Sequence, residues 1–376
     1  MPGEPLSIGV GIPPRPPASL LDATAEAARS AGADTLWCID HFSSFIPRGV
    51  WDETFSPLAV PGSNPDEMFE FQTLLGYAAA RAGDLRLGVG VTEAVRRHPL
   101  VLAQSFLTLS HLTDSKVILG IGAGERENID PVGLAFDSPV GRLDEALQIL
   151  HTAFETREPF DFDGQHFTLR KALTALPPGA GGKPDIWVAA MGPRMLRLAG
   201  RYADGWYPTG LTDPADYAAR LAIIRESATR NGRNPLDVTP GLQVFAVADE
   251  DRDQARSRLD EKPVRLMSLL LPGHEWSAVG ARHPLGTDFG GLVDFVPQHL
   301  SASQAAAALD AVPGSVLEKT VLWGTPDDIV SRVGALAKAG LRHLVLHDVP
   351  TLIGHPPGHA ASRFALIRAI KDTVRT

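Results

Sequence analysis

The side chains best suited to acid–base chemistry in this chain are Asp40, His41 and Glu125, each of which follows a short apolar segment. A histidine exchanges a proton near neutral pH, and a neighbouring carboxylate can accept or hold one. Together these groups could move a proton to or from a bound molecule. Structural roles are the alternative: His41 could be a hydrogen-bonded residue beneath the loop that follows it, and Glu125 could pair with Arg126.

Glu125 lies near the end of the most distinctive stretch of the sequence, Val117–Asn128. The stretch begins with apolar residues, two of them β-branched, which is typical of a buried strand. Glycine then occupies alternate positions: Gly120, Gly122 and Gly124. These glycines let the backbone turn tightly and let a flat molecule approach it. A dinucleotide fingerprint, G-x-G-x-x-G, is excluded because its third glycine is replaced by Glu125 in one register and by Glu127 in the other.

Composition excludes several classes of function. The formal charge of −9, without a basic run, argues against a nucleic-acid partner. Cys38 is the single cysteine, so an internal disulfide is impossible and a thiolate metal cluster is excluded; no H-E-x-x-H motif or close histidine pair suggests another metal site. No signal peptide is visible, and no apolar run reaches the roughly 18 residues of a membrane helix. We therefore expect a cytoplasmic protein without a membrane span or a metal.

Strands and helices alternate along the chain. The predicted strands are Leu6–Ile12, Asp34–Asp40, Leu85–Val91, the start of the 117–128 stretch, Asp185–Ala190, Gly205–Pro208, Val238–Ala248 and a strand containing Val345–His347. The predicted helices are Leu20–Ala31, Glu67–Arg81, Pro99–Leu112, Gly141–Phe154, Met195–Tyr202, Asp216–Arg230 and Pro326–Ala339, with a small hairpin at Asp161–Leu169. Eight strands, most followed by a helix, predict an α/β fold, a (β/α)8 TIM barrel. A doubly wound open sheet is the alternative, which strand count and chain length disfavour.

The segment between the seventh and eighth predicted strands is too long for one connection. We expect a helical insertion over residues 249–320, with helices at Asp249–Leu271 and Ser303–Ala311 and a loop at His274–His283. No repeat, low-complexity tract or linker divides the chain. The sequence therefore predicts a single domain over residues 1–376.

A barrel of this kind places its reacting groups at the carboxyl ends of the strands. The residues at those predicted ends are Asp40-His41, Thr92-Glu93, Glu125–Asn128, Met191–Arg194, Thr209-Gly210 and His347-Asp348. Arg194 directly follows Gly192-Pro193, where a helix starts, and this combination would suit a phosphate. An ordinary first-turn arginine is the alternative interpretation.

Several of these segments together carry a family resemblance. They are Ile39–Phe42, Leu87–Thr92, Leu119–Glu125, Ala189–Pro193 and Ala203–Trp206. In combination they resemble the bacterial-luciferase-like superfamily. Within it, the chain is similar to the branch that uses the deazaflavin coenzyme F420, and most similar to phthiodiolone ketoreductase-like proteins.

The resemblance implies roles for individual residues. By this likeness His41 serves the substrate oxygen near the hydride-transfer carbon, and Glu125 handles the proton at N1 of the deazaflavin. A cis peptide bulge is expected in the third strand at Gly90-Val91, against the ring. The other residues implied in cofactor binding are Asp40, Thr92 and Asn128 near the ring, and Met191, Gly192, Pro193 and Arg194 at the phosphate.

The implied substrate pocket departs from that of sugar-phosphate relatives. These carry a tryptophan where this chain has Phe45, and a lysine shortly after the position of Thr209, where this chain has none. A buried phosphate needs a charged partner, so a sugar phosphate is disfavoured. The loop Phe42–Phe55, including Phe45 and Trp51, offers apolar surface instead. We expect a small-molecule or lipid-like carbonyl substrate contacting Phe45, Trp51 and Thr209.

The resulting hypothesis is an F420-dependent oxidoreductase that transfers a hydride between the deazaflavin and a carbonyl or alcohol, as a ketone reductase for a hydrophobic substrate. One alternative is an FMN-dependent luciferase-like monooxygenase on the same barrel. Another is a barrel without catalysis that only binds a cofactor or joins an assembly. The family resemblance also implies a homodimer.

Overall fold

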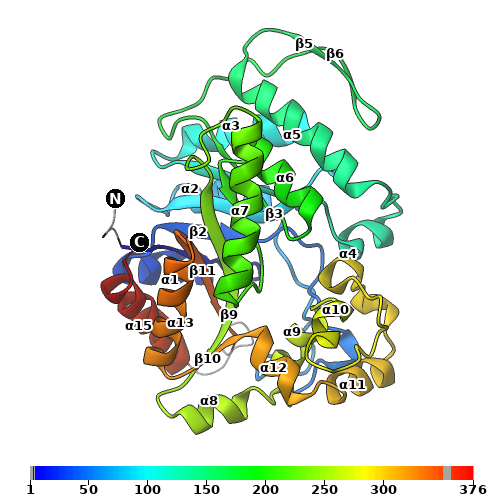
Figure 1. The fold of residues 1–376 in the computed structure, drawn as a ribbon, viewed down its shortest axis with the longest axis vertical. Coiled ribbons are helices and arrows are strands. Elements are labelled where there is room, and N and C mark those ends of the chain that lie inside the picture. The colour runs from blue at the N-terminus through cyan, green and yellow to red at the C-terminus, as the bar shows by residue number, and fades with distance from the viewer. Residues whose placement is uncertain (1–2, 4, 350–356, 376) are drawn as a thin grey trace.

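Eight parallel strands close into a barrel in the part of the chain that the computed structural model describes, residues 3, 5–349 and 357–375 (Figure 1). The strands are β1 (Ser7–Gly11), β2 (Thr35–Cys38), β3 (Arg86–Glu93), β4 (Val117–Gly122), β7 (Asp185–Val188), β8 (Gly205–Trp206), β9 (Thr239–Ala248) and β11 (His343–Asp348). They follow one another in this order, β11 pairs with both β1 and β9, and β8 pairs with β9. The last pairing closes the ring, so the predicted TIM barrel is confirmed and the open sheet is wrong.

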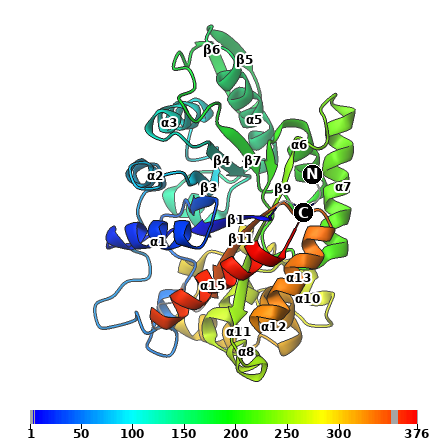
Figure 2. The same ribbon diagram turned by 90° about the vertical axis from the view of Figure 1, so that its left-hand side faces the viewer.

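Helices connect the strands and surround the barrel (Figures 1 and 2). They are α1 (Ser19–Ser30), α2 (Phe71–Ala79), α3 (Pro99–Leu112), α5 (Pro139–Glu155), α6 (Pro193–Tyr202), α7 (Pro214–Arg230), α13 (Pro326–Lys338) and α15 (Pro357–Thr373). Several begin two residues earlier than predicted, because a proline occupies the first turn, where no backbone N–H is needed. The helix α15 was not predicted. No helix in the described ranges has the length and apolar character to cross a membrane.

The connection from β9 to α13 contains the predicted helical insertion. Its elements are α8 (Arg252–Arg258), α9 (Lys262–Leu269), α10 (Gly273–Ser277), η3 (Gly291–Asp294), η4 (Pro297–His299), α11 (Ala302–Asp310), α12 (Gly314–Thr320) and a short strand β10 (Leu322–Gly324), which was not predicted and extends β9. The single helix predicted at Asp249–Leu271 is wrong, because Asp251 caps α8 and Pro263 starts a separate helix α9. The predicted loop His274–His283 begins within α10.

The insertion has its own hydrophobic core, which it shares with the loop that follows β2. Val50 and Phe55 of this loop are buried with Trp276 and Phe295 of the insertion. The loop contains a 3-10 turn, η1 (Arg48–Val50), which packs against α11. The predicted hairpin, formed by β5 (Phe160–Asp163) and β6 (Thr168–Ala172), lies at the opposite end of the molecule from the insertion (Figures 1 and 2). The insertion therefore covers only one side of the barrel.

Large aromatic side chains fill the barrel interior, and glycines on the strands make room for them. The ring centroid of Trp37 lies 5.4 Å from that of Trp187 and 4.6 Å from that of Tyr207. A Cβ atom added at Gly88 would lie 2.8 Å from the Trp37 ring, and one added at Gly205 would lie 2.3 Å from the Trp187 ring. The close approach expected at Gly88 is therefore that of a side chain packed inside the barrel.

This packing predicts that Gly205→Ala destabilises the protein. The added methyl group meets a rigid indole in a full interior, so we expect the free energy of unfolding to fall by about 1–3 kcal/mol. Gly76→Ala is the matched control: a Cβ at Gly76, within α2, meets nothing within 4 Å, and alanine favours a helix by roughly 0.5–1 kcal/mol over glycine. Urea unfolding followed by circular dichroism measures both. Equal stability of the two variants would contradict the packing argument.

Candidate active site

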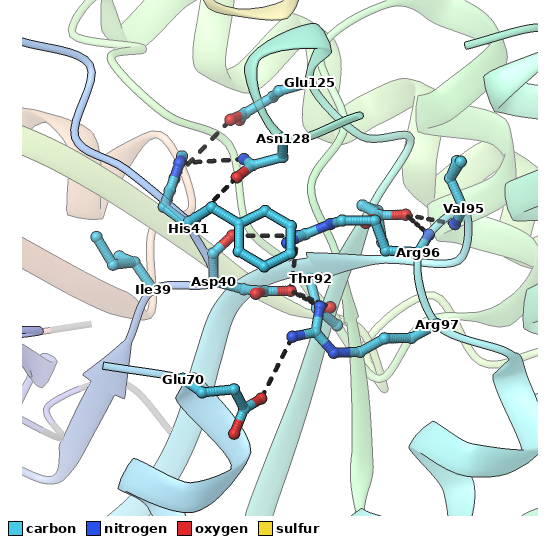
Figure 3. A network of polar contacts seen from close by, with 12 residues as sticks. Ile39, Asp40, His41, Glu70, Thr92, Val95, Arg96, Arg97, Glu125 and Asn128 are labelled. Carbon is cyan, nitrogen blue, oxygen red and sulfur yellow. Dashed lines mark hydrogen bonds and ion pairs between the residues drawn. The ribbon is translucent and has the colours of Figure 1, made fainter. Parts of the chain in front are cut away.

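Asp40 is the structural centre of the mouth formed by β2, β3 and β4 (Figure 3). Its carboxylate is 4% exposed, accepts a hydrogen bond from Thr92 Oγ1 at 2.6 Å, and pairs with Arg96 at 2.9 Å and Arg97 at 2.7 Å. Arg96 also pairs with Glu93 at the end of β3. Asp40 thereby ties the exit of β2 to the exit of β3, and it fixes the backbone at the residue that follows it.

That next residue, His41, lies between two carboxylates. Its Nδ1 atom is 2.6 Å from Oε1 of Glu127, and its Nε2 atom is 3.8 Å from Oε2 of Glu125. The amide nitrogen of Asn128 is 3.1 Å from Nδ1, while the amide oxygen of Asn128 accepts the backbone N–H of Phe42 at 3.1 Å. Figure 3 shows His41, Glu125 and Asn128 converging from the two chain segments. The edge-on ring of Phe45 closes one side, 5.2 Å from the His41 ring.

A single helical turn, α4 (Arg126–Ile129), brings Glu127 and Asn128 toward His41. Glu125 precedes this turn in an extended conformation. Arg126 pairs instead with Asp130 at 3.2 Å and with Asp294 of the insertion at 3.1 Å. The alternative pairing of Glu125 with Arg126 is therefore not what the structure shows.

The charges around His41 decide its protonation. Burial lowers the pKa of His41, but the hydrogen bond and charge of Glu127 and the charges of Glu125 and Asp40 outweigh burial and raise it to about 9. Burial raises the pKa of Glu125 to about 7, against the attraction of the His41 cation and with added repulsion from Glu127. At neutral pH, His41 is therefore a cation that can donate a proton, and Glu125 can exist in either state.

The third strand has an irregular end beside this cluster. The peptide bond between Gly90 and Val91 is cis, as expected from the resemblance, and the pairing of β3 with β4 shifts between Val89 and Thr92. A Cβ atom at Gly120 would lie 2.0 Å from the carbonyl oxygen of Val89, so β4 needs glycine here. The glycine pattern of the 117–128 stretch thus accommodates the irregular neighbouring strand.

The remaining predicted site residues lie on other strands or in the covering loop. Met191 and Arg194 are exposed after β7, the neighbour of β4, and Gly192 and Pro193 start α6 without a side-chain cap. Thr209 follows β8 and bridges to Gln243 of β9. Trp51 packs against the insertion core, and its indole N–H donates to Ser63 Oγ at 3.0 Å.

Glu127 and Arg96 are site residues that the sequence did not reveal. Alternation along an extended segment would place Glu125 and Glu127 on the same face, but the sequence gave no reason to choose the second carboxylate. Helical geometry after Glu125 decides which side chains reach His41. Within the described ranges, no group of three or more histidine, cysteine, aspartate or glutamate side chains is arranged to hold a metal ion.

Comparisons with known proteins place this geometry in context. Residues 8–343 match the family model for luciferase-like monooxygenase. Phthiodiolone/phenolphthiodiolone dimycocerosates ketoreductase of Mycobacterium tuberculosis (strain H37Rv) is 38% identical over 340 residues, covering 89% of this chain and 88% of that protein.

Two solved structures share the fold. An F420-dependent secondary alcohol dehydrogenase in complex with an F420-acetone adduct has a TM-score of 0.76 at 18% identity, covering 99% of this chain and 100% of the other. The oxygenating constituent of 3,6-diketocamphane monooxygenase from Pseudomonas putida, in complex with FMN, has a TM-score of 0.66 at 17% identity and covers 98% of each chain. The resemblance deduced from the motifs is confirmed: the chain belongs to the luciferase-like monooxygenase family.

Proposed function

We propose that this protein is a coenzyme F420-dependent oxidoreductase that reduces a ketone on a hydrophobic substrate. The observation that carries the proposal is the His41 cation held at the barrel mouth between Glu127 and Glu125. A protonated imidazole is the acid that carbonyl reduction needs, because the carbonyl oxygen gains negative charge as its carbon accepts a hydride. The ketoreductase named above and the F420-dependent alcohol dehydrogenase support the reaction class and the cofactor.

The residues present fit a flat cofactor that carries a phosphate. Gly122 leaves the floor beside Glu125 bare, so a planar ring can approach the backbone there. The start of α6 is exposed and uncapped, so its free backbone N–H groups and Arg194 suit a phosphate. Asn128 and the Gly90-Val91 bulge would border the ring. Asp40 and Thr92 hydrogen-bond each other in a buried position, so we assign them to supporting this floor.

When bound in its reduced form, the deazaflavin supplies the hydride for the carbonyl carbon. His41 donates the proton from Nε2 to the carbonyl oxygen, which completes the conversion of the carbonyl to an alcohol. Glu125, whose pKa of about 7 permits either state, takes up one proton at its carboxylate beside the cofactor site. Burial of both side chains excludes bulk water from these transfers. The pair favours reduction at neutral pH, because His41 starts the reaction protonated.

The rim of the site suits an apolar substrate. Phe42 is 57% exposed and Met191 is 38% exposed, on segments that follow neighbouring barrel strands. Leu134 is exposed as well, shortly after α4. Exposed apolar side chains gathered around a polar site indicate a ligand with apolar surface. We therefore propose a ketone attached to a hydrophobic chain, with Phe45 beside His41 contacting the part next to the carbonyl.

An FMN-dependent monooxygenase is the second candidate, because the family model and the FMN-bound structural neighbour both point to it. Oxygen chemistry needs a flavin, whereas a deazaflavin carries hydride. The two candidates therefore differ in which cofactor the protein binds and in whether the reaction consumes oxygen.

Cofactor titration is the first test of the proposal. We expect purified protein to bind F420 at least tenfold more tightly than FMN, as measured by fluorescence titration with each cofactor. Reduced F420 should then be oxidised in the presence of a hydrophobic ketone without consumption of oxygen. Preference for FMN together with oxygen consumption would replace the proposed function with monooxygenation.

Replacing His41 should separate chemistry from binding. His41→Ala removes the proton donor, so turnover with reduced F420 and a hydrophobic ketone should fall by roughly 10²–10⁴-fold, while the dissociation constant for F420 changes little. His151→Ala is the control, since His151 lies on α5, where its listed ion-pair partner is Glu155. Stopped-flow absorbance of the deazaflavin measures turnover. Unaltered turnover in His41→Ala would exclude His41 as the acid.

The activity of the protein should depend on pH in a defined window. Ketone reduction requires protonated His41, so kcat/KM should decline as pH rises through about 9. Proton uptake requires ionised Glu125, so kcat/KM should decline as pH falls through about 7. We expect a bell-shaped profile between these limits, and Glu125→Gln should remove the acidic limb. A profile that is flat between pH 6 and 10 would contradict both assignments.

A further inference from the structure

We infer that Glu127 is a positioning residue, which holds His41 in the orientation and protonation state needed to donate a proton from Nε2. The inference deepens the proposed function and rests on it for the reaction that His41 assists. The contact that carries it joins Glu127 Oε1 to His41 Nδ1 at 2.6 Å. Charge-assisted hydrogen bonds have this length, and the group bound at one ring nitrogen of a histidine determines what the other nitrogen can do.

The bonding of Glu127 differs from that of the other buried carboxylates at the mouth. Glu93 accepts hydrogen bonds from the backbone N–H groups of Val95 and Arg96 and pairs with the Arg96 side chain. Asp40 is bound by Thr92 and by two arginines. These two carboxylates have structural partners from several directions. Glu127, with 1% of its side chain exposed, has His41 as its ion-pair partner.

The second oxygen of Glu127 strengthens the argument. Oε2 of Glu127 is buried and has no hydrogen-bond partner among the described residues. Burial of a carboxylate oxygen without a partner is unfavourable, so a purely structural role would be better filled by a group with fewer polar atoms. The charge of Glu127 is useful at this position because it stabilises a cation, and that cation is His41.

The neighbouring amide fixes the location of the proton. The Oδ1 atom of Asn128 accepts the backbone N–H of Phe42, which directs the Asn128 amide N–H group toward His41. The amide can only donate, whereas the Glu127 carboxylate can only accept. A 2.6 Å contact with a carboxylate requires a hydrogen between the two atoms, so Nδ1 of His41 is protonated toward Glu127. Nε2 is then the nitrogen that faces Glu125 and the substrate side.

Other charged groups face His41, but none replaces Glu127. Glu125 approaches Nε2 at 3.8 Å, beyond hydrogen-bond distance. Asp40 precedes His41 in the chain, and its charge is compensated by Arg96 and Arg97. Removal of the Glu127 charge should therefore lower the pKa of His41 from about 9 toward its ordinary value.

The test compares Glu127→Gln with Asp130→Asn, a matched control. Asp130 follows the same helical turn and pairs with Arg126, so this substitution removes a nearby negative charge without removing a partner of His41. NMR titration of protein labelled with ¹⁵N-histidine reports the protonation of His41, whose signal is assigned by its absence in His41→Ala. In Glu127→Gln the pKa of His41 should fall by at least about one unit, which is a tenfold change in the protonation equilibrium. In Asp130→Asn it should stay within about 0.3 units of the parent value by the same measure.

Turnover provides the second readout. In Glu127→Gln, the alkaline limb of the profile should shift to lower pH by the same interval, while the dissociation constant for F420 is unchanged. Glu127→Asp retains the charge and should restore most of the shift, which also covers the case in which Glu127→Gln fails to fold. An unchanged pKa of His41 in a folded Glu127→Gln protein, or a Glu127→Asp protein whose His41 has lost its raised pKa, would overturn the inference. The titration needs neither cofactor nor substrate, so a failure of the F420 proposal remains distinguishable from a failure of this one.

Discussion

The buried ion pairs of Asp40 with Arg96 and Arg97 are the interaction on which the site depends. His41 directly follows Asp40, so a change in the Asp40 position would carry the imidazole with it. Two guanidinium groups from the segment after β3 hold one carboxylate after β2, and Thr92 adds a hydrogen bond from within β3. This arrangement places a rigid charged support beneath a side chain that has to meet two further carboxylates within a few tenths of an ångström.

The insertion acts on the same site from outside the barrel. It packs against the loop after β2 through a shared hydrophobic core, and Asp294 of η3 holds Arg126 in the turn that carries Glu127. Both sides of the His41 cluster are therefore anchored to the insertion: the histidine side through the loop, and the carboxylate side through α4. Sequence-distant segments thereby determine the distance between His41 and Glu127.

Most of the barrel was predictable because buried parallel strands and amphipathic helices leave strong periodic signals. The predicted strands contain or overlap those of the barrel, and the ends of β2, β3 and β4 correctly located Asp40, His41 and Glu125 at one mouth. Shorter features were missed for physical reasons. The strand β10 has three residues and gains its pairing only from the end of β9, so no local pattern marks it. Glu127 was missed because α4 is a single turn, too short for periodicity to reveal which of its side chains face His41.

The charge balance explains why Glu125 differs from its neighbours. Arg96, Arg97 and His41 provide three positive charges at the mouth, while the carboxylates facing them are Asp40, Glu93, Glu127 and Glu125. The first three carboxylates have a cation within hydrogen-bond distance, whereas Glu125 has His41 only at 3.8 Å. Burial without such a close partner raises the pKa of Glu125 to about 7. The same charge set that keeps His41 protonated therefore leaves one carboxylate free to change state near neutral pH, and a proton donor and a proton acceptor arise together from the arrangement of seven side chains.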